Sequence, residues 1–114
     1  MCRTSCRGEI REDKQRHGND RSEVPAKIAG TFTKNIVKAA PVLWGKKIVE
    51  EQEAVRAVVI NTGIANACTG AQGYENVVTE AKEVAKLLDI KPEEVVVGST
   101  GVIGQQLPMD VIKE

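Results

Sequence analysis

The chain lacks the features that would mark it for binding nucleic acid or a membrane. Its only aromatic residues are Phe32, Trp44 and Tyr74, too few for a surface on which bases stack. Sixteen basic residues balance sixteen acidic ones, so no net charge attracts a polyanion. No apolar run reaches the length of a membrane span, and the charged N-terminal segment lacks a signal peptide's apolar stretch. We therefore expect a cytoplasmic protein that binds neither nucleic acid nor membrane.

Cysteine and histidine are also scarce. Cys2, Cys6 and Cys68 are odd in number and irregularly spaced, so they indicate no disulfide framework. No further Cys or His pair completes a metal site with Cys2 and Cys6, and no metal is expected. The only histidine, His17, lies in a polar segment and gives Cys68 no base that would make it a nucleophile. We expect Cys68 to be a packed thiol.

The composition changes near Val24. Ten of the first 22 residues are charged, and Ile10 is their only aliphatic residue. Such a segment cannot supply a core element, and its composition predicts disorder. The chain therefore divides into a polar tail, residues 1–23, and a domain that begins at residue 24 and extends to residue 114.

The domain has the pattern of an α/β protein, with a mixed sheet and packed helices. Apolar and β-branched residues predict strands over 28–33, 36–43, 54–60 and 95–97. The near-continuous apolar run of 54–60 indicates burial on both faces. Apolar residues at helical spacing predict a helix over 74–89. The strand over 54–60, the helix over 74–89 and the strand over 95–97 together form a βαβ-like unit.

The first loop of this unit, residues 61–73, is rich in small residues, amides and hydroxyls and carries no charge. A phosphate-binding loop would need Lys and Ser or Thr after its last glycine, whereas Gly73 precedes Tyr74. We interpret the segment as a packed loop in which asparagine side chains bond to nearby backbone.

A second glycine-rich segment, residues 98–104, follows the last strand, with glycines at every third position. The spacing does not fit the dinucleotide fingerprint, and Ser99 does not stand in a hydrolase motif. A tight turn without a ligand would explain the pattern. The alternative is a set of donors for an oxyanion, for which the Thr100 hydroxyl and the Gly101 backbone are the best candidates.

Taken together, these segments resemble the ornithine acetyltransferases, or glutamate N-acetyltransferases, of arginine biosynthesis. Order and spacing match over residues 24–112. The matching blocks are 24–26, 29–33 with Asn35, 37–42, 61–70, 72–73, 99–104 and 107–109. One departure lies in the first loop, where Ile64 replaces the asparagine that usually ends the family's Asn-Ser-Gly-Asn sequence.

The resemblance implies a reaction. Enzymes of this family cleave themselves, and the threonine exposed at the new N-terminus takes the acetyl group of N-acetylornithine as an acyl-enzyme. Glutamate then receives that group. Some members also take acetyl-coenzyme A as a donor, and no metal or cofactor is needed. The family's oxyanion pair falls on Thr100 and Gly101, which the resemblance thus makes catalytic residues.

The resemblance also implies that part of the enzyme is missing. The family's nucleophilic threonine lies beyond the position that matches Glu114, so this chain alone is expected to be a partial α/β domain without activity. Its partners would be N-acetylornithine, glutamate and the rest of the enzyme, in an oligomer of processed chains. Before Val24 the family has an apolar strand, whereas this chain is polar. A frameshift upstream of Val24 would explain this difference, and residues 1–23 would then be non-native.

Two other functions fit the same residues. One is a related aminopeptidase-like protein with a threonine nucleophile and the same fold. The other is a non-catalytic domain that binds a small molecule through the two glycine-containing loops.

Overall fold

The computed structural model describes residues 16–51 and 54–112. Its elements are the strands β1 (Arg16–Lys27), β2 (Ala54–Ile64) and β3 (Val95–Val102), the helices α1 (Ala40–Glu51), α2 (Gly70–Leu88) and α3 (Met109–Ile112), and a short 3-10 helix, η1 (Pro92–Glu94). The sheet has the order β1-β2-β3, with β1 antiparallel to β2 and β2 parallel to β3. The predicted α/β class, with a mixed sheet and packed helices, is confirmed.

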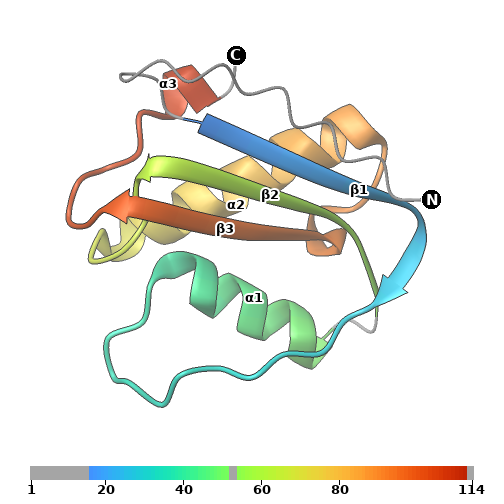
Figure 1. Ribbon diagram of the computed structural model, residues 1–114, viewed down its shortest axis with the longest axis horizontal. Coiled ribbons are helices and arrows are strands. Elements are labelled where there is room, and N and C mark those ends of the chain that lie inside the picture. The colour runs from blue at the N-terminus through green and yellow to red at the C-terminus, as the bar shows by residue number, and fades with distance from the viewer. Residues whose placement is uncertain (1–15, 52–53, 113–114) are drawn as a thin grey trace.

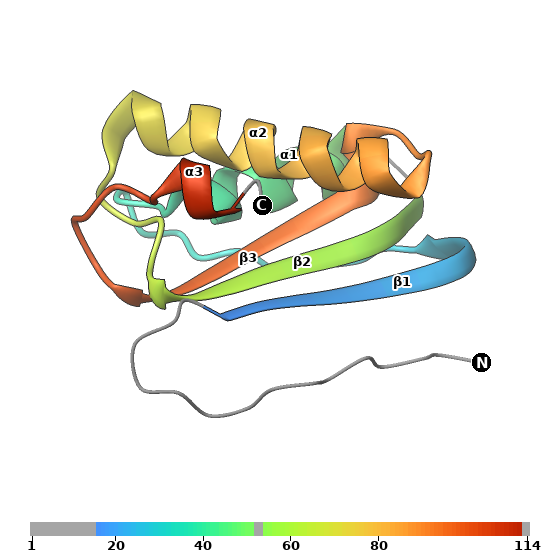
Figure 2. The ribbon, with the colours of Figure 1, turned by 90° about the horizontal axis from the view of Figure 1, so that it is seen from above.

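The helices lie together on one face of the sheet, and the other face is open among the described residues (Figures 1 and 2). Ala57 and Val59 of β2 are buried under the helices, whereas Ile60 on the opposite face is 48% exposed. The prediction that this strand is buried on both faces was therefore wrong. The apolar residues of the open face do not receive a covering layer from this part of the chain.

The core lies between the sheet and helices α1 and α2. Trp44 fixes α1 to the sheet, because its indole Nε1 donates a hydrogen bond to the Val95 carbonyl at 2.9 Å. The Trp44 ring also meets Tyr74 of α2 edge to face, with 6.4 Å between ring centroids. The buried apolar residues are Ala40, Trp44, Ile48, Ala57, Val59, Val77, Ala81, Ala85, Val95 and Val97.

The N-terminal strand corrects the predicted division of the chain. Residues 16–23 of the predicted polar tail belong to β1, and residues 16–21 pair with β2, where Arg16 lies opposite Thr62 and Arg21 opposite Ala57. A strand at the sheet edge needs only backbone partners and tolerates polar side chains on both faces. Residues 1–15, with Cys2 and Cys6, lie outside the described residues.

Two further predictions fail between β1 and β2. Residues 28–33, predicted as a strand, have no regular secondary structure. The strand predicted over 36–43 is replaced by a bend and the start of α1, which begins at Ala40. Pro41 lies within this predicted strand, but it is the second residue of the helix, where its missing N–H is no loss.

The βαβ-like unit is confirmed. The predicted strand 54–60 extends to Ile64, and the predicted strand 95–97 extends to Val102. Helix α2 begins at Gly70, four residues before the predicted start, and ends at Leu88. Asp89 follows in the left-handed conformation, and its N–H bonds to the Ala85 carbonyl.

Candidate functional site

The two glycine-containing segments meet at the ends of adjacent parallel strands. In the β2–β3 pairing, Thr62 lies opposite Thr100 and Gly63 opposite Gly101. The predicted oxyanion residues therefore stand beside the first loop, at the carboxyl edge of the parallel pair. Open α/β sheets commonly place their binding sites at this edge.

Gly101 makes a backbone contact that no other residue could make. Its φ angle is +130°, and that of Gly63 is +116°. A Cβ added to Gly101 would lie 2.3 Å from the Gly63 carbonyl carbon and oxygen and 2.8 Å from the Ile64 nitrogen. The structure thus supports a packing reason for the glycine, beside the donor role that the family resemblance gives it.

The side chains on the two faces of these strand ends differ in their surroundings. Because side chains alternate along a strand, Asn61 and Ser99 follow the buried residues onto the helix side. Thr62 and Thr100 lie on the open face. Thr100 is exposed, and its hydroxyl has no hydrogen-bond partner among residues 16–51 and 54–112. It is free to bind a group that approaches the open face.

The first loop holds its own polar groups, as predicted. Asn66 is 1% exposed, and its Nδ2 donates to the Gly73 carbonyl at 2.7 Å. The Thr69 hydroxyl donates to Asn66 Oδ1 at 2.5 Å. Gly73 is required here, because an added Cβ would lie 1.8 Å from Thr69 Oγ1. The Asn66 amide therefore fixes the start of α2 and is engaged within the protein, whereas Asn61 Oδ1 is buried without a partner among the described residues and Gln72 is exposed.

A second set of amide contacts joins α2 to the segment after β3. Asn76 Nδ2 donates a hydrogen bond to Gln106 Oε1 at 3.4 Å, and Gln106 Nε2 donates to the Thr69 carbonyl at 3.0 Å. Gly104 N–H donates to the Ala67 carbonyl at 3.0 Å. These contacts tie the C-terminal end of the glycine-rich segment 98–104, and Gln106 after it, to the first loop and to α2.

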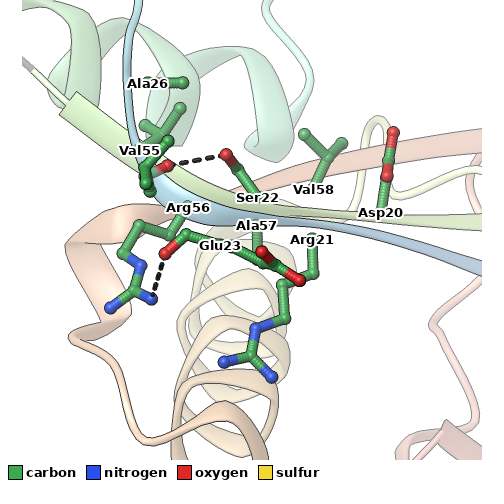
Figure 3. Close-up of a pocket in the computed structure, with 10 residues that line it drawn as sticks. Asp20, Arg21, Ser22, Glu23, Ala26, Val55, Arg56, Ala57 and Val58 are labelled. Atoms are coloured by element: carbon green, nitrogen blue, oxygen red, sulfur yellow. Dashed lines mark hydrogen bonds between the residues drawn. The ribbon is translucent and has the colours of Figure 1, made fainter. Parts of the chain in front are cut away.

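A hollow of the described surface lies elsewhere. It has a volume of about 400 Å³ and lies beside an irregularity in the β1–β2 pairing, between Arg21 and Ala26 (Figure 3). There Arg56 Nη2 donates to the Glu23 carbonyl at 3.1 Å. Arg56 precedes Thr62 by six residues along β2, which corresponds to about 20 Å of strand. This hollow therefore does not contain the predicted site.

Cys68 differs from the expectation of a packed thiol. It is exposed, with a φ angle of +57° at the start of α2. It lines a smaller hollow of about 340 Å³ with Lys38, Thr69, Gly70 and Tyr74 among its neighbours. The sequence pattern of small residues around Cys68 gave no sign of this exposure.

Glu80 of α2 is a buried carboxyl group that the sequence pattern does not predict. A charged residue in an amphipathic helix is expected on the solvent side, but Glu80 is 2% exposed. Neither carboxylate oxygen has a hydrogen-bond partner in the described part of the chain. Burial raises the pKa of Glu80 from 4.5 to about 7. The sequence does not show which element packs beside the helix, so a charged residue next to its apolar face is expected to be exposed to solvent.

No cluster of three or more His, Cys, Asp or Glu side chains could hold a metal ion within residues 16–51 and 54–112. In the same part of the chain, no helix is both long and apolar enough to cross a membrane.

This architecture defines the class of protein: part of an α/β protein with a backbone-lined candidate site at the carboxyl edge of two parallel strands. The sequence pattern of the ArgJ family matches residues 4–114, and the chain belongs to this family. The resemblance to the ornithine acetyltransferases is thereby confirmed.

Curated relatives support the assignment. The chain is 50% identical over 93 residues to the arginine biosynthesis bifunctional protein ArgJ of Thermotoga neapolitana, covering 81% of this chain and 23% of that protein. It is 57% identical over 91 residues to the protein ArgJ 1 of Clostridium acetobutylicum, covering 80% and 22%. The chain thus spans less than a quarter of the length of these relatives.

Two solved structures share the fold. The crystal structure of the ArgJ protein of Bacillus halodurans matches with a TM-score of 0.84 and 39% identity, over 90% of this chain and 54% of that one. The ornithine acetyltransferase of Mycobacterium tuberculosis, solved in complex with ornithine, matches with a TM-score of 0.79 and 42% identity, over 85% and 53%.

Proposed function

We propose that this chain is part of an enzyme that transfers an acetyl group from N-acetylornithine to glutamate. In the first step a threonine hydroxyl attacks the acetyl carbonyl, the amide bond breaks, and ornithine leaves with the proton. In the second step the amine of glutamate attacks the threonine ester and regenerates the hydroxyl. The threonine belongs to the part of the enzyme outside residues 1–114.

The contribution of this chain would be to stabilise the negative oxygen that forms in both steps. The carrying observation is that the exposed Thr100 hydroxyl, which has no partner among the described residues, stands beside Gly101 at the end of β3. Donors fixed before the reaction stabilise an oxyanion without reorganising. The ornithine bound to the Mycobacterium tuberculosis relative supports a substrate of this class.

The proposal includes cleavage of the whole protein into two chains. This chain covers 54% and 53% of the two solved chains but only 23% and 22% of the two curated relatives. The solved chains are therefore much shorter than the curated ones, as cleavage would make them. The rest of the enzyme would cover the open face of the sheet, where Ile60 is half exposed.

The test joins residues 1–114 of this chain to the remaining part of the Thermotoga neapolitana relative. We expect this joined protein to form N-acetylglutamate and ornithine from N-acetylornithine and glutamate, with an acetyl adduct detectable by mass spectrometry. A parallel reaction with acetyl-coenzyme A shows whether this donor is also accepted. The 114-residue chain alone is the control and should form neither product nor adduct. A cleaved joined protein that forms no adduct would contradict the proposal.

A further inference from the structure

We propose that Ser99 is a positioning residue, which holds Thr100 and Gly101 in place from the opposite face of the sheet. The inference rests on the proposed function, because it assigns Ser99 to the same reaction. The evidence for it is a set of hydrogen bonds made by the Ser99 hydroxyl. From the sequence, Ser99 was considered only as a nucleophile.

The Ser99 hydroxyl joins β3 to the first loop in two ways. It accepts a hydrogen bond from the Asn66 N–H at 2.8 Å and donates one to the Ile64 carbonyl at 3.3 Å. Asn61 Nδ2 donates to the same carbonyl at 2.8 Å. The chain that leaves β2 is therefore attached to β3 by the Ser99 hydroxyl and by a backbone bond from the Ala65 N–H to the Val102 carbonyl at 2.8 Å, and the Asn61 amide also holds it.

These hydrogen bonds lie next to the close backbone contact between Gly63 and Gly101. Ile64 directly follows Gly63, against which Gly101 lies so closely that an added Cβ would be 2.3 Å from its carbonyl. Ser99 stands two residues before Gly101 on the same strand. A shift of the Ile64–Asn66 segment would therefore move the surface on which Gly101 rests, and Thr100 with it.

The same bonds argue against a nucleophilic role for Ser99. Its hydroxyl is engaged as acceptor and as donor, and it lies on the helix side of the sheet, away from Thr100. A serine in this place can influence the reaction only through the position of its neighbours. Misplacing a reacting group by about 1 Å can cost about 100-fold in rate, so the expected effect is large.

The kinetic test uses Ser99→Val and Ser99→Thr in the joined protein. Valine and threonine have almost the same shape, so the pair isolates the hydroxyl. We expect Ser99→Val to lower kcat by about 10- to 100-fold with KM changed by less than about twofold, and Ser99→Thr to restore kcat to within about threefold. If Ser99→Val does not fold, Ser99→Ala removes the hydroxyl without added volume. Ile48→Val, in the core of α1, is the control for a general loss of stability.

A second measurement needs no activity. Hydrogen exchange of the Asn66 amide in the 114-residue chain should become faster in Ser99→Val and remain slow in Ser99→Thr. Unchanged exchange in Ser99→Val would overturn the inference. Faster exchange with an unchanged kcat would also overturn it, and would leave the proposed function intact. If the unsubstituted joined protein transfers no acetyl group, the proposed function fails and, with it, the role given to Ser99.

Discussion

The segments 61–73 and 98–104 begin side by side at one edge of the sheet, and both are rich in glycine and in small polar residues. In the first loop, Asn66 and Thr69 are buried and bond to each other and to nearby backbone. In the second, Thr100 is exposed and its hydroxyl has no partner in the described residues. Two segments of similar composition thus differ in burial. The polar side chains of the first bond within the protein, whereas the Thr100 hydroxyl of the second is accessible to a ligand.

The largest expected effect breaks the backbone contact that joins the two loops. Gly101→Ala should destabilise the 114-residue chain by more than about 3 kcal/mol, because it adds a clash to a strained φ angle. The control is Gly104→Ala, where φ is also positive, at +85°, but no atom lies within 4 Å of the added Cβ. Urea unfolding followed by circular dichroism should show a much smaller loss for Gly104→Ala. Equal losses would contradict the contact.

The second effect concerns the buried carboxyl of α2. The pKa of folded Glu80, about 7, lies above the unfolded value of 4.5, so ionisation of Glu80 destabilises the fold as pH rises through this range. Glu80→Gln should therefore have no effect of this kind below pH 4.5 and should stabilise the chain increasingly up to pH 7, by at most about 3 kcal/mol. Urea unfolding at several pH values measures the difference.

The control for Glu80 lies on the same helix. Glu75 is exposed, so Glu75→Gln should leave the pH dependence of the unfolding free energy in place. A free-energy difference between Glu80→Gln and the unsubstituted chain that stays constant from pH 4 to about pH 8 would show that Glu80 is not buried as an isolated carboxyl.

The smallest effect compares two threonines directly. Thr69→Val leaves Asn66 Oδ1 buried without its donor and should cost about 1–2 kcal/mol. Thr62→Val changes a hydroxyl on the open face and should stay within about 0.5 kcal/mol of the unsubstituted chain. Thermal unfolding of the two variants under the same conditions checks the difference. A larger loss of stability in Thr62→Val than in Thr69→Val would contradict the view that the buried hydroxyl stabilises the fold more than the one on the open face.

The sequence predicted the elements that have a clear apolar pattern. Helix α2 has apolar residues at spacings of three and four, strands β2 and β3 contain short apolar runs, and all three were found. β1 was missed because an edge strand depends on backbone pairing, which its polar side chains do not reveal. Helix α1 was not predicted: its first residues were assigned to a strand, and Pro41 suits a helix start as well as the end of a strand.

The candidate site could be described from the sequence only in part. Thr100 and Gly101 were predicted as oxyanion donors from glycine spacing and from the family resemblance, and this stays a prediction; the sequence did not show that Gly101 lies against Gly63. The hydrogen bonds of Ser99 were also hidden, because its partners lie 33 and 35 residues earlier in the chain. Contacts of this kind depend on strand register, which neither composition nor local spacing specifies.

The central claim is that the open face carries the reaction, and Thr100→Val in the joined protein tests it most directly. The measurement is the single-turnover rate at which N-acetylornithine acetylates the nucleophilic threonine, followed by mass spectrometry. We expect a rate about 100- to 1000-fold lower, because one donor to the oxyanion is lost while the shape of the side chain is kept. An unchanged rate in a folded, cleaved variant would contradict the claim and leave Thr100 with a structural role only.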